Sequence, residues 1–140
     1  MKTQILYFTR TNNSKRIAEA IADKLGCEAI QFTDNRNWSG FWGYMMAGFY
    51  SSTDRKVEIE VLGKLEPADT TIVVAPMWAG GIAPAARTLI KQLGRDKVHL
   101  VVVSSGSNTK DRAGYKSIRD IAENQKNEDV VIEELVASLR

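Results

Sequence analysis

Cysteine, histidine and proline are scarce in this chain of 140 residues, which has 1 Cys, 1 His and 3 Pro. A single cysteine, Cys27, excludes an intramolecular disulfide, so we expect a reduced, cytoplasmic protein. Cys27 follows an expected helix end and is interpreted as a small buried apolar residue. No metal-binding cluster and no nucleophile–base pair can be assembled, so no catalytic residue is predicted. His99 lies inside an apolar run and is interpreted as structural.

Strong charge of one sign and long apolar runs are also absent. The net charge is +2 and the sequence pI is about 8.7. The basic residues form no stripe of the kind that nucleic-acid binding needs. No apolar run is long enough to span a bilayer, and the run Ile5–Phe8 lacks the features of a signal peptide. Neither nucleic acid nor membrane is expected as a partner, and the composition fits a single domain over residues 1–140.

Short apolar runs alternate along the chain with segments of helical periodicity. Buried strands are predicted where β-branched and other apolar residues follow one another, at 5–8, 29–32, 71–75 and 98–103. Apolar stripes at helical spacing predict helices over 17–25, 82–93 and 115–122, and Pro84 suits the first turn of the second, whose stripe includes Ile82. This alternation predicts a doubly wound α/β domain, a parallel sheet between two layers of helices.

Two segments leave alternatives open. Val57–Val61 alternates apolar and polar residues, as an edge strand or an extended connection would. The C-terminal segment 129–140 has apolar residues at helical spacing, but Val130 to Ile132 alone fits a strand. Periodicity does not decide between them.

The loop after the first strand carries the clearest functional signal, a run of six polar residues from Thr9 to Ser14. Ligands of doubly wound folds bind beyond the carboxyl ends of the strands. A helix that begins there directs its N–H groups and positive dipole end at the loop, which suits phosphate. The hydroxyl and amide side chains add donors. A helix cap would explain one of these residues but not the run, so we predict a phosphate-binding loop.

Other phosphate-binding motifs do not fit this loop. The Gly-Lys-Ser/Thr of a P-loop and the three spaced glycines of a dinucleotide fingerprint are both absent. A receiver domain would need acidic residues where the chain has Thr9 and Pro76. A cysteine phosphatase would need a cysteine in the loop.

Two further loops follow predicted strands and are built from small residues and one large aromatic. "PMWAGGIAP" places Trp78 before Ala79, Gly80 and Gly81, and "SSGSN" begins at Ser104. A flat aromatic beside small residues suits a planar ligand, because the ring can stack and backbone can approach ring heteroatoms. We therefore expect one site, with phosphate at the first loop and a ring at the second and third.

Together these motifs resemble those of the flavodoxins. The family's phosphate loop, Ser/Thr-x-Thr-Gly-Asn-Thr, corresponds here to Thr9-Arg10-Thr11-Asn12-Asn13-Ser14. "APMWAGGIAPAARTLIKQL" is similar to the Pro-x-Trp-Ala-Gly segment and following helix of short flavodoxin-like proteins, and "WSGFWGYMMAGFYSS" and "LEPAD" are also similar to that subgroup. The resemblance implies FMN as cofactor. The implied cofactor-binding residues are Thr9, Arg10, Thr11, Asn12, Asn13, Ser14, Pro76, Met77, Trp78, Ala79, Gly80, Gly81, Ser105, Gly106 and Ser107.

The resemblance also implies a three-layer α/β/α fold with a five-stranded parallel sheet in the order 2-1-3-4-5. It favours residues 129–140 as the fifth strand, with the last helix missing. Part of one sheet face would then lack its cover, and a homodimer is our hypothesis for supplying it. The chain departs from the family in having Asn12 for glycine, a slightly basic charge, and Arg10, Lys15 and Arg16 near the phosphate.

The function implied by the resemblance is electron transfer by bound FMN to or from a redox partner protein. With fewer acidic residues than flavodoxins have, we expect less negative reduction potentials. One alternative is an FMN-dependent NAD(P)H or quinone oxidoreductase, for which the aromatic segment 38–49 would leave room beside the ring. Another is a module that keeps the fold without flavin.

Overall fold

A computed structural model describes residues 3–8, 13–34, 59–62, 68–78, 81–106, 109, 113–123 and 126–139. Five strands of its central sheet run parallel: β1 (Thr3–Tyr7), β2 (Ala29–Asp34), β4 (Thr70–Trp78), β6 (Val98–Ser104) and β7 (Ser117–Ala122). Their spatial order is β2-β1-β4-β6-β7, which confirms the order 2-1-3-4-5 predicted for the five parallel strands.

Two short antiparallel strands extend this sheet. β3 (Ile59–Val61) pairs with the outer side of β2, which confirms the edge-strand interpretation of the alternating segment. β5 (Gly81–Ile82) folds back on the end of β4, through the pairs Met77↔Ile82 and Trp78↔Gly81.

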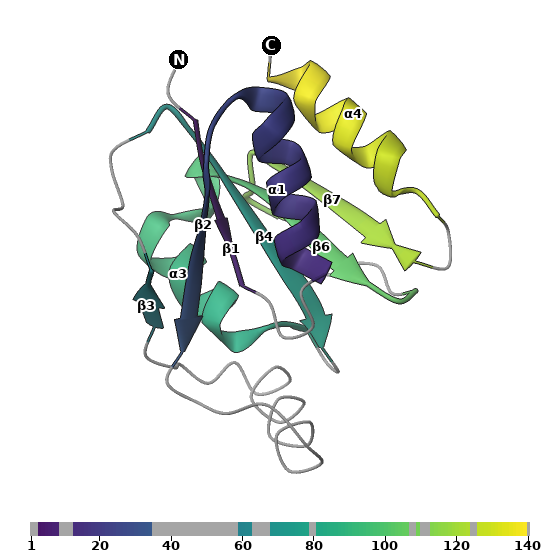
Figure 1. Ribbon diagram of the computed structural model, residues 1–140. Coiled ribbons are helices and arrows are strands. Elements are labelled where there is room, and N and C mark those ends of the chain that lie inside the picture. Colours follow the sequence, from purple (N-terminus) through teal and green to yellow (C-terminus); the bar gives the residue numbers. More distant parts are fainter. Residues whose placement is uncertain are drawn as a thin grey trace.

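Helices cover both faces of the sheet (Figure 1). α1 (Asn13–Leu25) and α4 (Glu128–Ser138) share one face, where their buried residues pack with those of β1, β4, β6 and β7. α3 (Pro84–Leu93) covers the other face and is followed by a short 3₁₀ turn, η1 (Arg95–Lys97). The three-layer α/β/α architecture is thus confirmed.

Local sequence explains where α1 and α3 begin and end. Ile17, Ala18, Ile21 and Ala22 form the buried stripe of α1. Gly26 ends that helix with φ +70°, and Cys27 N donates to Ala22 O, the bonding of a Schellman cap. α3 starts at Pro84, whose missing N–H costs nothing in a first turn. Ile82, which the sequence pattern included in this helix, lies in β5 instead.

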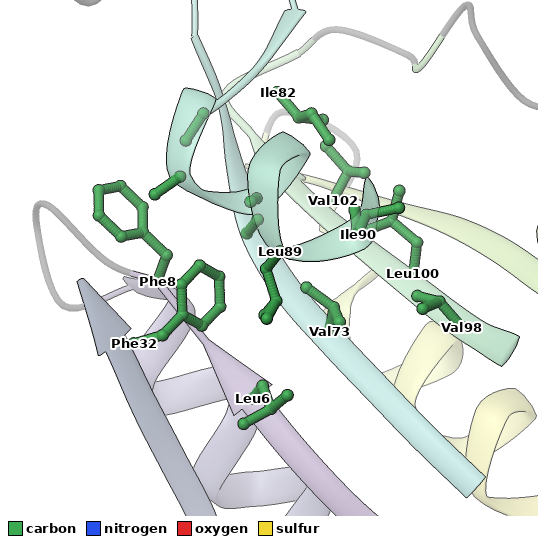
Figure 2. Packing of buried hydrophobic residues seen from close by; sticks show 14 residues of the cluster. Leu6, Phe8, Phe32, Val73, Ile82, Leu89, Ile90, Val98, Leu100 and Val102 are labelled. Carbon is green, nitrogen blue, oxygen red and sulfur yellow. The ribbon is translucent and has the colours of Figure 1, made fainter. Parts of the chain in front are cut away.

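The central strand β4 is buried on both faces, as its unbroken apolar run predicts. Ile72 and Val74 face α1 and α4, whereas Val73 and Ala75 face α3. Figure 2 shows side chains of β1, β2, β4 and β6 gathered around α3, with Phe8 and Phe32 in ring contact at 5.8 Å between centroids.

Two predictions for the C-terminal third of the chain are wrong. Residues 115–122 were expected to be helical, but Ser117–Ala122 is strand β7. Ile118 packs in the core on the α3 side and Ile121 in the core on the α1 and α4 side, so this edge strand is only partly apolar on each face. Its spacing therefore imitates a helical stripe.

The C-terminal segment is helix α4 and not the fifth strand. Val131, Ile132, Leu135 and Val136 form its buried stripe. The last helix is therefore present and covers the face for which a homodimer was hypothesised, so the structure gives no reason to propose one.

Candidate functional site

Three loops start from the same edge of the sheet because they follow parallel, neighbouring strands. β1, β4 and β6 are adjacent, and their carboxyl ends are Tyr7, Trp78 and Ser104. After β1 the next parallel strand, β2, is added on one side of the sheet, and after β4 the next parallel strand, β6, is added on the other side. The switch in strand order therefore lies between β1 and β4, where folds of this class bind ligands.

The first loop joins the end of β1 to the amino end of α1. Phe8 N donates to Val74 O at 3.1 Å, which keeps the chain on β4 up to the loop. Thr9, Arg10, Thr11 and Asn12 lie outside the described residues. Asn13 begins α1 and is exposed, and Ser14 is 2% exposed. The first turn of α1 contains no acidic residue, so its amino end keeps the positive dipole that an anion needs.

The basic residues at the start of α1 have partners on the helices. Lys15 Nζ lies 4.0 Å from Glu19 Oε1, one turn along α1. Arg16 Nη1 donates to Glu128 Oε2 of α4 at 2.5 Å, and this bond is the main cause of a raised Arg16 pKa. The charge of Arg16 is thus compensated by α4. Burial, followed by the charge of Glu19, raises the pKa of Tyr7, so this phenol before the loop stays protonated.

The second loop is the tip of a β-hairpin. The pair Trp78↔Gly81 leaves only Ala79 and Gly80 between β4 and β5. Ala83 N then donates to Pro76 O at 3.1 Å, which fixes the return of the chain into α3. Pro76 and Met77 are partly buried, while Ala79, Gly80 and the side chain of Trp78 lie outside the described residues. The hairpin was missed in the sequence, because Ala79-Gly80 is not one of the Asn-Gly, Asp-Gly or Gly-Gly pairs that usually signal a two-residue hairpin loop.

The third loop follows β6. Ser105 and Gly106 are exposed beyond its end, and Ser107 lies outside the described residues. Three residues after Gly106, Thr109 is buried and makes two hydrogen bonds to the carboxylate of Asp120 in β7. Thr109 and Asp120 were not singled out in the sequence, because Asp120 fell inside a segment interpreted as a helix.

His99 lies away from these loops, near the amino end of β6. Its Nδ1 is 2.7 Å from Ser117 Oγ of β7. Burial, and then the charges of Lys116 and Arg119, lower the His99 pKa. This position agrees with the structural interpretation of the residue.

Two other properties bear on the kind of site. The described part of the chain holds no group of three or more His, Cys, Asp or Glu side chains suited to a metal ion. Within the same residues, no helix is both long and apolar enough to cross a membrane.

Comparison with known proteins identifies the fold. No protein-family model and no curated protein matches the chain. Among solved structures, a flavoprotein from Lactobacillus acidophilus NCFM, in complex with FMN, superposes with a TM-score of 0.69 at 18% identity, covering 93% of this chain and 96% of that one. The fold is flavodoxin-like.

Two proteins classed as flavoproteins from Bacteroides species have the same fold. The one from Bacteroides eggerthii gives a TM-score of 0.70 at 16% identity over 98% of this chain and 96% of that one. The one from Bacteroides uniformis gives 0.67 at 16% identity over 93% and 97%. These flavoproteins therefore share the fold of this chain over nearly all of the residues compared.

Proposed function

We propose that the protein binds FMN at the edge formed by the loops after β1, β4 and β6. The observation that carries the proposal is that β1, β4 and β6 are neighbours in the sheet, that the switch in strand order lies between β1 and β4, and that α1 begins directly after the loop that follows β1. The FMN complex of the Lactobacillus acidophilus flavoprotein, which has the same fold, supports it.

The described residues fit such a ligand. At the phosphate end, α1 begins with exposed Asn13 and buried Ser14 and carries no carboxylate in its first turn. At the ring end, exposed Ser105 and Gly106 are small enough to let backbone approach a planar group. The other loop residues named from the sequence would complete the site. Bound FMN would supply the redox chemistry, and the protein would bind it, orient it and set its potential.

Titration with FMN tests this proposal, with Trp and flavin fluorescence as the signal. We expect tight one-to-one binding. In Asn13→Asp, a carboxylate at the helix amino end should weaken FMN binding by about tenfold or more, since it opposes the phosphate. Binding of riboflavin, which lacks the phosphate, should be unchanged.

Gln92 is exposed near the carboxyl end of α3, away from the loops. Gln92→Glu adds the same charge there and should leave FMN binding unchanged. Absence of FMN binding to the unsubstituted protein at high micromolar concentration would refute the proposal.

We further propose that the protein transfers electrons with a redox partner protein and is not a stand-alone oxidoreductase. Electron transfer by a bound flavin requires the protein to position the cofactor and to set its potential, and it requires no catalytic acid or base. The aromatic segment 38–49, on which the oxidoreductase alternative depended, lies outside the described residues. With NADH or NADPH alone, flavin reduction should be slow, and a flavodoxin reductase should accelerate it. Fast reduction by NAD(P)H alone would favour the oxidoreductase.

A further inference from the structure

The described residues of the connection from β6 to β7 contain no helix. Such crossovers commonly contain a helix, whose packing on the sheet holds the preceding loop in place. Here the described residues between the two strands (105, 106, 109 and 113–116) are not helical. The loop that carries Ser105 and Gly106 must therefore be held in another way.

Asp120 provides an anchor for this loop. Its Oδ1 accepts a hydrogen bond from Thr109 N at 3.0 Å and another from Thr109 Oγ1 at 2.5 Å. Thr109 is only 8% exposed, so these bonds are shielded from water. Hydrogen bonds to a carboxylate are stronger than those between neutral groups. Thr109 is thereby fixed to β7 by both its backbone and its side chain.

Asp120 is itself held rigidly. It lies opposite Val102 in the β6–β7 ladder. On the other side of β7, Asn127 Nδ2 donates to Asp120 O at 3.0 Å, and Asn127 Oδ1 accepts from Ala122 N at 2.9 Å. The side chain of Asn127 thus bonds the strand and makes no cap bond to α4. The backbone of Asp120 is therefore held on both sides of β7, and its carboxylate projects from a fixed position in the sheet.

We propose that Asp120 is a positioning residue for the loop at Ser105 and Gly106, acting through Thr109. The loop is bounded by Ser104, in the β6 ladder, and by Thr109, on Asp120. With Ser104 and Thr109 both fixed, Ser105 and Gly106 have fewer accessible conformations, which lowers the entropy lost when a ligand orders them. This inference rests on the proposed FMN site and gives Asp120 a role in binding the ring without contact with it.

Two substitutions separate this role from general stability. Asp120→Ala removes the acceptor of both Thr109 bonds, whereas Asp120→Asn keeps an oxygen in the same place. Ser117→Ala is the matched control. It also lies in β7, at the amino end of the strand, and it removes a partly buried hydrogen bond to His99 of β6. Each variant is measured for unfolding by urea, for FMN and riboflavin affinity, and for amide hydrogen exchange at Gly106 in the flavin-free protein.

We expect Asp120→Ala to speed exchange at Gly106 and to weaken both FMN and riboflavin binding about tenfold, with Asp120→Asn recovering most of the loss. Ser117→Ala should lower stability without changing exchange at Gly106 or flavin affinity. Unchanged exchange at Gly106 in Asp120→Ala, or faster exchange with full flavin affinity, would overturn the inference. If the unsubstituted protein binds no FMN, the proposed function fails, and exchange at Gly106 alone decides whether Asp120 positions the loop.

Discussion

Arg16 of α1 and Glu128 of α4 form an ion pair that joins the amino ends of the two helices, with 2.5 Å between Nη1 and Oε2. A second pair, Lys24 with Glu133 at 2.7 Å, joins the helices further along. The two helices therefore run side by side in the same direction, as Figure 1 shows. The carboxylate of the first pair is the better shielded, since the Glu128 side chain is 29% exposed and that of Glu133 is 65% exposed, whereas Arg16 and Lys24 are 57% and 44% exposed.

This difference predicts unequal coupling energies. A double-mutant cycle with Arg16→Gln and Glu128→Gln should give about 0.5–1 kcal/mol, since solvent screens both groups. The cycle with Lys24→Gln and Glu133→Gln should give less than about 0.5 kcal/mol. Urea unfolding at low and high salt measures both, and the Arg16–Glu128 coupling should shrink as salt rises. A larger coupling for the Lys24 pair would contradict this ranking.

Gly26 is predicted to be needed for its backbone conformation and not for space. Its φ is +70°, and a Cβ there would meet no atom within 4 Å. Gly26→Ala should therefore cost about 1 kcal/mol through strain alone. Gly26→Asn should cost less, since Asn tolerates the left-handed region. Urea midpoints at constant m-value measure both. Equal stability of Gly26→Ala and the unsubstituted protein would show that the chain ends α1 differently.

Leu135 tests the helical assignment of the C-terminal segment. It is fully buried against the sheet, whereas Val130 of the same helix is 60% exposed. Leu135→Ala should destabilise the protein by about 2–5 kcal/mol because it leaves a cavity. Val130→Ala should change stability by less than about 0.5 kcal/mol. Thermal or urea unfolding compares the two, and a similar loss at both positions would speak against this helix face.

His99 should make stability depend on pH. Burial and the nearby charges of Lys116 and Arg119 lower its pKa in the folded state below the ordinary 6.5. The unfolded chain then binds the proton more readily, so the contribution is complete above pH 6.5 and is lost as the pH falls toward the folded pKa. Unfolding free energies from about pH 8 to 5 should fall in this window, and His99→Gln should flatten that part of the profile. An unchanged profile in His99→Gln would assign the dependence to other groups.

Charge at the third loop should tune the flavin potential if the proposed site is correct. Reduced flavin is anionic, so a carboxylate beside it disfavours reduction. Ser105→Asp, at an exposed position, should lower the two-electron potential by roughly 20–40 mV, about 1–2 kcal/mol. Ser105→Asn is the neutral control of similar size. Redox titration of the FMN-loaded protein measures the shift. An unchanged potential in Ser105→Asp would show that the ring does not lie near Ser105.

The same reasoning underlies the expectation that the protein's own potential lies above those of acidic flavodoxins. Redox titration of the unsubstituted protein tests it directly. A potential as low as theirs would show that local backbone and ring contacts outweigh the overall charge.

The sequence pattern predicted a strand or helix correctly where the whole element is buried or where its apolar residues all pack on one core. Residues 71–75 are apolar because both faces of β4 are covered, and the stripe of α1 faces a single core. It failed at β7, an edge strand whose apolar residues Ile118 and Ile121 belong to different cores. At the C-terminal segment the period left helix and strand open, and the resemblance to the family favoured the strand, whereas the segment is helix α4.

The sequence predicted which loops form the candidate site but not the contacts that hold those loops. Composition identified the polar run at 9–14 and the small residues at 79–81 and 105–107, because a ligand-binding loop needs those residue types. The contact of Thr109 with Asp120 depends on the register of β7 against β6, which no local pattern contains. Long-range hydrogen bonds of this kind appear only once the strands are paired.

The side chain of Asn127 also covers part of one edge of the sheet. β7 is the last strand of the sheet on its side, and a bare edge exposes N–H and C=O groups to which a strand of another molecule can add. Asn127 already occupies two of those groups, Ala122 N and Asp120 O. Its amide thus acts as a one-residue substitute for a neighbouring strand, and it leaves this end of the edge closed to intermolecular sheet growth.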